Sequence, residues 1–215
     1  MPAAILVNKT PFPHAEVRNW WPHELLDEVL DEFQAAERSP MPWKHFHGTN
    51  EEKYEAGPAF FGEATRSLVR SIKAVGPRLS ELFDLPPLTM ELVGGGYHRI
   101  EPGGLLNVHS DFSVSPATGH YRRVNLLIYL NRIWFDDDGG FLELWDGDGP
   151  FTRIKPLMNT TAMFATSSTS WHGHPVPVVE GRTRRSFAAY FYSQEPPPDF
   201  TNQDTVWHPR APRVR

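Results

Sequence analysis

The sequence predicts a mainly β fold, either a β-sandwich or a jelly roll, with helices packed on one face. Amphipathic helical patterns are confined to the first 87 residues. From Leu88 onward, short stretches rich in β-branched and aromatic residues alternate with glycine-rich turn signals. The chain has 215 residues, 40% of them hydrophobic, which is enough for one substantial core. A helical layer followed by many short strands is typical of such a two-layer architecture.

Two helices are expected before the strands begin. Residues 22–36 place their apolar side chains on one helical stripe, namely Leu25, Leu26, Val29, Leu30 and Phe33. Residues 64–75 form a second stripe of Leu68, Val69, Ile72 and Val75. Gly76 and Pro77 should end or kink this second helix, and residues 78–83 should add another short turn.

The remaining pattern predicts strands separated by turns. The strands are expected at residues 89–93, 97–100, 105–111, 124–130, 141–145, 151–154, 161–166 and 186–192. The turn signals are the segments GGG, EPGG, DDDGG, DGDGP and VEGRT. Residues 43–62 are polar and aromatic without a clear period, so they are expected to be a long loop that acts as a lid or a binding loop.

Composition excludes several classes of function. There is no cysteine, so any metal ion must be held by histidine, aspartate or glutamate. The net charge of −5 leaves no basic footprint for nucleic acid. No apolar stretch approaches the roughly 18 residues of a transmembrane helix, and the N-terminal residues lack the pattern of a signal peptide. A cytoplasmic protein without a membrane segment is expected.

A candidate metal site begins in the segment LLNVHSD, residues 105–111. Side chains alternate across a strand, so His109 and Asp111 point to the same face. A distal partner is available 63 residues after His109, where His172 and His174 both follow a predicted strand. Two histidines and one carboxylate on one face of an octahedral ion leave the opposite positions open, as non-haem Fe(II) oxygenases require.

An iron that activates O₂ also needs a source of electrons. If that source is 2-oxoglutarate, its far carboxylate should meet a fixed arginine. The last predicted strand is preceded by Arg182, Arg184 and Arg185, and Arg184 lies twelve residues after His172. Tyr129, on the strand over residues 124–130, is positioned to add a hydroxyl donor.

At this point the chain resembles a known family, the prolyl-hydroxylase-type branch of the Fe(II)/2-oxoglutarate-dependent dioxygenases. The resemblance covers residues from about 90 to 193 and rests on the order of seven short motifs. They are Tyr97, Gly103-Gly104, His109 with Asp111, Tyr129-Leu130-Asn131, the segment GGFLEL at 139–144, His172, and Arg184-Arg185-Ser186. The fold that this resemblance implies is a double-stranded β-helix, a jelly roll with helices bracing the major sheet.

The resemblance also implies the site. Its metal ligands and catalytic residues would be His109, Asp111 and His172, with His172 favoured over His174 by the spacing after residues 161–166. Its 2-oxoglutarate would bind through Arg184, Tyr129 and Tyr97, with Arg184 favoured over Arg182 and Arg185. Fe(II), 2-oxoglutarate and ascorbate are the expected cofactors.

The implied activity is hydroxylation of a C–H bond, with O₂ as co-reactant and 2-oxoglutarate converted to succinate and CO₂. Asp111 favours hydroxylation over halogenation, because related halogenases carry a small residue at that position. The substrate stays open between a peptide or protein side chain and a small amino-acid-like or natural-product molecule, and the oligomeric state also stays open. The alternative function is a non-catalytic metal-bound β-barrel that acts as a sensor or interaction module.

The organisation expected is a single domain over residues 1–215. Its N-terminal helical layer spans about 1–87, its β-helix core about 88–193 and its tail 194–215. Four other histidines, His45, His47, His98 and His120, have no partner at ligand spacing along the sequence. We expect them to lie on the surface or to make ordinary hydrogen bonds.

Overall fold

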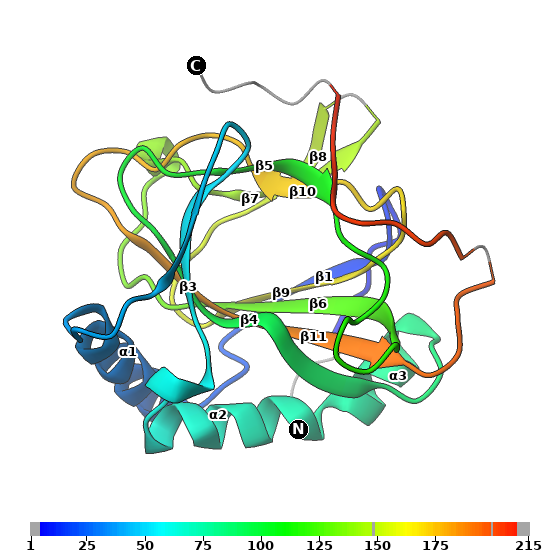
Figure 1. The fold of residues 1–215 in the computed structure, drawn as a ribbon, viewed down its shortest axis with the longest axis horizontal. Coiled ribbons are helices and arrows are strands. Elements are labelled where there is room, and N and C mark those ends of the chain that lie inside the picture. The colour runs from blue at the N-terminus through cyan, green and yellow to red at the C-terminus, as the bar shows by residue number, and fades with distance from the viewer. Residues whose placement is uncertain (1–4, 148, 199, 210–215) are drawn as a thin grey trace.

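The structure, a computed structural model, describes residues 5–147, 149–198 and 200–209 of the chain. Within this part, helices cover one face of a large antiparallel sheet, and a smaller antiparallel sheet lies over its other face (Figure 1). Residues 1–4, and residues 199 and 210–215 of the predicted tail, lie outside the described residues. The predicted fold class, mainly β with bracing helices, is confirmed. None of the helices described is long and apolar enough to cross a membrane.

The described residues form two sheets of unequal size. The major sheet has seven strands in the order β1-β9-β6-β11-β4-β3-β2. These are β1 (His14–Arg18), β9 (Thr160–Ala165), β6 (Tyr121–Tyr129), β11 (Arg184–Ser193), β4 (Thr89–Ile100), β3 (Glu52–Ala56) and β2 (Lys44–His47). The minor sheet has the order β12-β5-β10-β7-β8. These are β12 (Val206–Trp207), β5 (Leu106–Ser110), β10 (His172–His174), β7 (Leu142–Asp146) and β8 (Gly149–Ile154).

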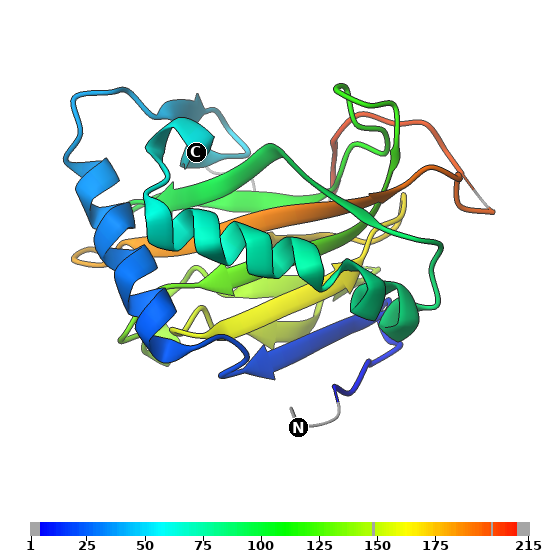
Figure 2. The same cartoon turned by 90° about the horizontal axis from the view of Figure 1, so that it is seen from below.

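The helices bury the stripes that the sequence predicts. They are α1 (His23–Glu37), α2 (Glu63–Ala74) and α3 (Gly76–Phe83), with short 3-10 turns at Pro58–Phe60 and Asp136–Asp138. Leu26, Val29 and Phe33 of α1 are fully buried, as is Leu68 of α2. Figure 2 shows α1 and α2 lying across the face of the major sheet. This packing forms the largest hydrophobic core, which includes Phe187 of β11.

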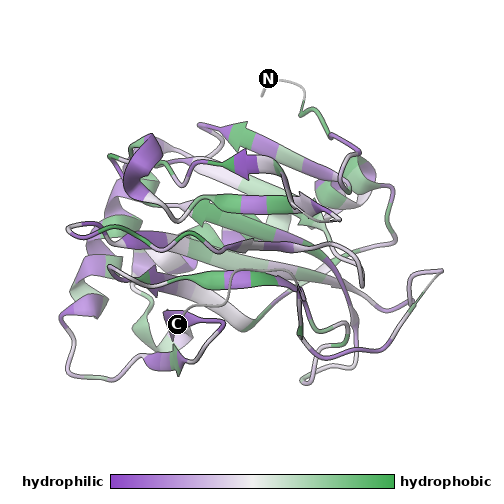
Figure 3. Ribbon diagram, turned by 90° about the horizontal axis from the view of Figure 1, so that it is seen from above, coloured by the Kyte–Doolittle hydropathy of each residue, from purple (hydrophilic) through white to green (hydrophobic). Residues whose placement is uncertain are grey.

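A second, smaller core lies between the two sheets. Leu142 and Leu144 of the minor sheet pack there with Phe164 and Tyr129 of the major sheet. Hydrophobic and hydrophilic segments alternate along the strands in Figure 3, as expected when the two faces of a strand differ in surroundings. The smaller core occupies only part of the space between the sheets, and the rest is a cavity lined by both polar and apolar side chains.

Two predicted strands, 89–93 and 97–100, are one strand in the structure. The intervening GGG segment was interpreted as a turn, and that interpretation is wrong: β4 runs from Thr89 to Ile100. Its pairing with β11 shifts register between Ala188 and Tyr190, so the glycines accommodate a β-bulge. Gly96 has a φ of 103°, and a Cβ there would lie 2.6 Å from the carbonyl oxygen of Ala56. Only glycine allows β3 to approach β4 this closely.

The predicted loop over residues 43–62 is also wrong in part. It contains the antiparallel hairpin of β2 and β3, which forms one edge of the major sheet. Two further strands lie in segments predicted to be helical or irregular: β1 in the N-terminal layer, and β12 in the tail, where it pairs with β5. These strands are short or charged, so they carry no apolar alternation that could identify them.

Helix α2 begins against a carboxylate from α1. Glu32 accepts hydrogen bonds from the backbone N–H groups of Ala64 and Thr65, at 2.9 Å each, and from the Thr65 hydroxyl at 2.6 Å. A negative charge at a helix N-terminus satisfies the free N–H groups and interacts favourably with the helix dipole. A Cβ on Gly62 would lie 2.2 Å from Glu32 Oε1, so glycine is needed for the carboxylate to reach the helix.

We expect Glu32→Ala to lower the free energy of unfolding by about 2 kcal/mol, because it leaves several partly buried donors without a charged acceptor. Urea denaturation of the two proteins measures the difference. The control is Glu28→Ala, which removes an exposed carboxylate from the same helix and should change stability by less than about 0.5 kcal/mol. Equal effects of the two substitutions would contradict the role given to Glu32.

Candidate functional site

Three metal-ligating side chains meet on the inner face of the minor sheet. β5 and β10 are neighbouring antiparallel strands, and His172 lies directly opposite His109 in their register. Asp111 follows β5 and, two residues after His109, faces the same side. The ligand atoms of His109, Asp111 and His172 all lie within 4.8 Å of one another. The sequence pair and its distal histidine are therefore brought together by strand pairing.

Both imidazoles are held in the orientation that a metal requires. The ring nitrogen Nδ1 of His109 bonds to the carbonyl oxygen of Asn107, and that of His172 to the carbonyl oxygen of Ser170, at 2.8 Å each. A carbonyl oxygen only accepts, so each Nδ1 carries a proton and each Nε2 is the ring nitrogen left to face a metal. The Nε2 atoms lie 3.6 Å and 3.4 Å from the two oxygens of Asp111. Backbone acceptors of this kind commonly orient metal-bound histidines.

Asp111 is held by two side chains from the opposite sheet. Arg122 of β6 lies 3.3 Å from Asp111 Oδ2, and the side-chain amide of Asn125 donates to the same oxygen at 2.8 Å. Arg122 also donates to Asn125 at 2.9 Å and lies over the ring of Tyr190 at 3.7 Å. Burial acts to raise the pKa of Asp111, but Arg122 and then His172 outweigh it and hold this pKa well below its usual value. The carboxylate is thus ionised and ready to bind a cation.

His172 is also in the protonation state that a ligand needs. Burial lowers its pKa to about 4, against the opposing effect of Asp111. Its imidazole is therefore neutral at neutral pH. Two imidazole nitrogens and one carboxylate on one side of a cavity fit Fe(II), which such a set binds while leaving its other positions open.

His174, the alternative distal ligand, lies elsewhere in the cavity wall. Its Nδ1 accepts a hydrogen bond from the backbone N–H of Leu106 at 3.2 Å. Among the described residues it belongs to no cluster of metal-ligating groups. The geometry thus favours His172, as the spacing did.

Arg184 is a buried cation at the edge of the same cavity. Its Nε donates to the carbonyl oxygen of Gly140 at 2.7 Å, and its two terminal nitrogens lie 3.5 Å from Ser186 Oγ and from Tyr129 Oη. Arg184 and Ser186 line the cavity, whereas Tyr129 is fully buried behind them. Within the described part of the chain, no carboxylate forms an ion pair with Arg184. A buried guanidinium without a counterion is suited to binding an anion.

The competing arginines do not reach the cavity. Arg185 points to the opposite face of β11 and forms an ion pair with Glu37 of α1 at 2.9 Å. Arg182 pairs with Asp138 at 2.9 Å and is 30% exposed. Of the three arginines, the geometry selects Arg184 as the predicted cosubstrate residue.

The position of Tyr97 differs from the predicted one. It was predicted to bind the cosubstrate, but the structure does not bring it to the cavity. Tyr97 lies opposite Phe187 in the pairing of β4 with β11, and both rings pack in the core beneath the helices. Its hydroxyl bonds to the Thr65 side chain at the start of α2. Directly paired residues share one face of a sheet, and this face is the one away from the cavity.

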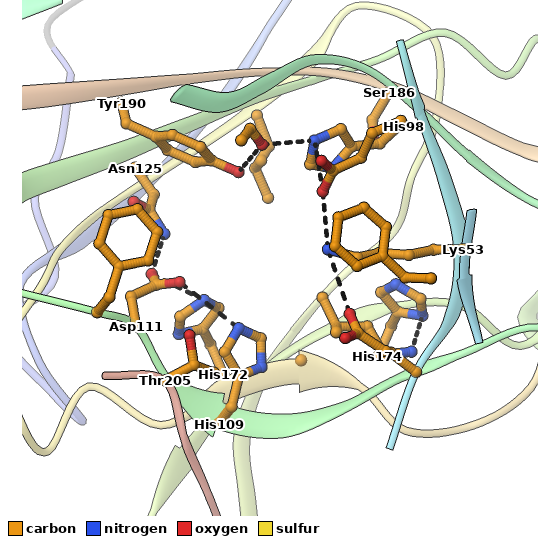
Figure 4. Close-up of a pocket in the computed structure, with 18 of the residues that line it drawn as sticks. Lys53, His98, His109, Asp111, Asn125, His172, His174, Ser186, Tyr190 and Thr205 are labelled. Carbon is orange, nitrogen blue, oxygen red and sulfur yellow. Dashed lines mark hydrogen bonds and ion pairs between the residues drawn. The ribbon is translucent and has the colours of Figure 1, made fainter. Parts of the chain in front are cut away.

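The cavity has a volume of about 700 Å³ and joins the metal-ligand cluster to Arg184. Figure 4 shows His109, Asp111 and His172 on one side and Lys53 and His98 on the other. The far wall belongs to β3 and β4, where Lys53 pairs with Glu55 at 2.9 Å and His98 donates to the carbonyl oxygen of Gly94 at 3.0 Å. His98 thus makes an ordinary hydrogen bond, as predicted, but it also lines the cavity, which was not predicted.

Two groups of functional importance were not identified from the sequence. Asn125 shares a strand face with Leu127, so alternation along the strand is enough to predict its orientation. Its hydrogen bond to Asp111 could not be predicted from that alternation. Arg122 was missed because β6 shifts register opposite Phe191 and Tyr192. That bulge changes which side chains face the cavity, so simple alternation assigns Arg122 to the wrong face.

Comparison with known proteins finds a family model that matches part of the chain. Residues 95–192 match the model of the 2OG-Fe(II) oxygenase superfamily. The prolyl 3-hydroxylase OGFOD1 of Mus musculus is 32% identical over 98 residues, which are 43% of this chain and 17% of that protein. Its counterpart in Xenopus laevis is 30% identical over 99 residues, which are 42% of this chain and 19% of that protein. The chain thus matches less than a fifth of the length of these relatives.

Solved structures share the fold. A Pseudomonas putida prolyl-4-hydroxylase superimposes with a TM-score of 0.65 at 17% identity, covering 85% of this chain and 93% of that one. A Trichoplax adhaerens prolyl hydroxylase, in complex with a hypoxia inducible factor peptide fragment, gives 0.64 at 16% identity and 83% coverage of both chains. HygX of Streptomyces hygroscopicus, with nickel and 2-oxoglutarate bound, gives 0.55 at 13% identity, covering 88% and 84%.

These matches confirm the jelly-roll fold, and the cluster of His109, Asp111 and His172 lies inside the segment that the family model covers. Residues 95–192, slightly less than half of the chain, therefore match a 2OG-Fe(II) oxygenase domain, and the fold around them is shared with solved prolyl hydroxylases.

Proposed function

We propose that this protein hydroxylates a C–H bond of a peptide or protein side chain, using Fe(II), 2-oxoglutarate and O₂. One observation carries the proposal. Arg184, a buried arginine without a carboxylate partner in the described part of the chain, and a cluster of two histidines and one aspartate line the same cavity. The arginine is suited to bind the far carboxylate of 2-oxoglutarate, and the cluster of histidines and aspartate is suited to bind Fe(II).

Each residue has a defined task in this proposal. His109, Asp111 and His172 would hold one face of the iron, and Arg122 and Asn125 keep the Asp111 carboxylate ionised and oriented. Arg184 would bind the far carboxylate of 2-oxoglutarate, with Ser186 and Tyr129 beside it. When bound, Fe(II) supplies the activation of O₂, driven by the conversion of 2-oxoglutarate to succinate and CO₂. Leu142 and Phe164 exclude water from the inner wall.

A peptide substrate is supported by the relatives. The curated relatives are named prolyl 3-hydroxylases, and the Trichoplax adhaerens structure holds a peptide fragment. A small molecule is the second candidate class, because HygX also has a structure with hygromycin B bound. Asp111 supports hydroxylation over halogenation, since its carboxylate occupies the position that a halide would need. The cytoplasmic location and the use of ascorbate stay predictions from the sequence.

The direct test is succinate production. Metal-free protein supplied with Fe(II), 2-oxoglutarate and ascorbate should form succinate when proline-containing peptides are added, and mass spectrometry should find one added oxygen atom in the reactive peptide. Asp111→Ala should abolish both signals while the circular dichroism spectrum stays unchanged. Metal binding without succinate under any peptide or metabolite tried would instead favour the non-catalytic sensor or interaction module.

The distal ligand can be assigned by comparing two substitutions. We expect His172→Ala to abolish the visible absorption band that Fe(II) and 2-oxoglutarate give together under anaerobic conditions, because one of three ligands is lost. His174→Ala should keep the band, since His174 contacts the backbone of Leu106 and not the cluster. The reverse result would transfer the role to His174.

The role of Arg184 can be tested by replacing each arginine in turn. Arg184→Ala should weaken 2-oxoglutarate binding at least tenfold, because a charge-assisted hydrogen bond contributes about 1.5–3 kcal/mol. Arg184→Lys should recover part of the loss, since it restores the charge but not the planar guanidinium. Arg185→Ala is the matched control and should leave the 2-oxoglutarate affinity unchanged, because Arg185 faces α1. Normal binding by Arg184→Ala would remove it from the cosubstrate site.

A further inference from the structure

A second group of metal-ligating side chains lies on the hairpin of β2 and β3. His45 Nε2 is 2.5 Å from Glu52 Oε1, and His47 Nδ1 contacts Glu52 Oε2. The ligand atoms of all three residues lie within 4.8 Å of one another. His45 and His47 thus lie on the surface and make hydrogen bonds, as expected, and the partner that they share comes from the next strand.

Strand geometry explains the cluster. His45 and His47 are two residues apart on β2 and so share one face. Glu52 lies directly opposite His47 in the pairing of β2 with β3, which places its carboxylate between the two rings. All three side chains of the set therefore come from one hairpin.

This cluster is separate from the candidate iron site. The alternate residues of the hairpin, including Phe46 and Lys53, line the cavity, whereas His45, His47 and Glu52 do not. Their side chains lie on the outer face and are 42%, 78% and 30% exposed, so an ion can reach them from solvent. In Figure 1 the hairpin rises along one edge of the two sheets, with β3 labelled.

The outer cluster is held in place on two sides. The His45 ring stacks on Tyr54, with centroids 4.2 Å apart and planes 5° from parallel, and Arg99 lies over Tyr54 at 4.5 Å. At the other end, the backbone N–H of Glu52 donates to the carbonyl oxygen of Leu105 at 2.9 Å, which ties the hairpin to the minor sheet. Ligands that are already positioned lose less conformational entropy when an ion binds.

We propose that His45, His47 and Glu52 form a second metal site that binds Zn(II) on the outer face of this hairpin. Two imidazoles and one carboxylate are a common protein ligand set for zinc, and a water molecule completes the tetrahedron. Neither this ion nor this site takes part in the proposed oxygenase reaction. A bound ion cross-links β2 and β3 beside the turn at residues 48–51, so it stabilises the strands whose inner face forms a wall of the cavity.

The experiment counts zinc ions with and without the candidate iron site. Tag-free, metal-free full-length chain is titrated with ZnCl₂ by calorimetry. We expect two equivalents in the wild type, one in Asp111→Ala/His172→Ala, and none after His45→Ala and His47→Ala are added to that background. In the same background, Zn(II) should slow amide hydrogen exchange in residues 44–56.

Two variants separate metal binding from simple hydrogen bonding. Glu52→Gln keeps a hydrogen-bonding side chain but removes the anionic ligand, so it should weaken Zn(II) binding at least tenfold. His23→Ala removes an exposed histidine outside both clusters and should change nothing. Zinc binding that survives the loss of His45 and His47, or no binding at all in the Asp111→Ala/His172→Ala background, would overturn the proposal and leave a hydrogen-bonded cluster only. Because His45, His47 and Glu52 lie on the outer face, circular dichroism should show that their substitutions leave the fold unchanged from the background in which they are made.

Discussion

The buried charge of Asp111 links the two sheets and constrains the site. An isolated carboxylate in such a place would take up a proton, because burial penalises the charged form. Arg122 and Asn125 prevent this, and both come from β6 in the opposite sheet. The sheets must therefore stay at one separation, which the apolar contacts between Leu144 and Phe164 help to maintain. Metal-ligand geometry in the minor sheet consequently depends on packing in the major sheet.

The cavity holds two buried arginines whose electrostatic situations differ. Arg122 forms an ion pair with Asp111, so the two buried charges neutralise each other. Among the residues that the structure describes, Arg184 has only neutral acceptors within reach, namely Gly140, Ser186 and Tyr129. Burial accordingly lowers the pKa of Arg184, against the opposing effect of Tyr129. A buried cation without compensation costs stability, and an anionic ligand offsets that cost on binding. This asymmetry explains why Arg184, and not Arg122, is the side chain suited to a dicarboxylate.

The predictions are correct where a single periodicity, that of a helix or of a strand, extends along a whole element. Leu26, Val29 and Phe33 recur at helical spacing and are buried. The two-residue period aligned His109 with Asp111, and it separated Arg184 from Arg185 on β11. These assignments needed only the alternation of side chains along a single strand or the pitch of a single helix. The prediction of His172 as the distal ligand depended in addition on the order of motifs that the chain shares with the family that it resembles.

The remaining features could not be predicted because they depend on pairing between strands. A bulge in β6 moves Arg122 onto the cavity face, and the β4 bulge turns an apparent Gly-Gly-Gly turn into continuous strand. Tyr97 was assigned to the cosubstrate from motif order, yet its pairing with Phe187 places it under the helices. The same limit applies to His45 and His47, whose partner Glu52 becomes visible only when β3 folds back on β2. Along this chain, the two-residue alternation within a strand identifies which side chains share a face. The register between paired strands determines which of these side chains come together in a site.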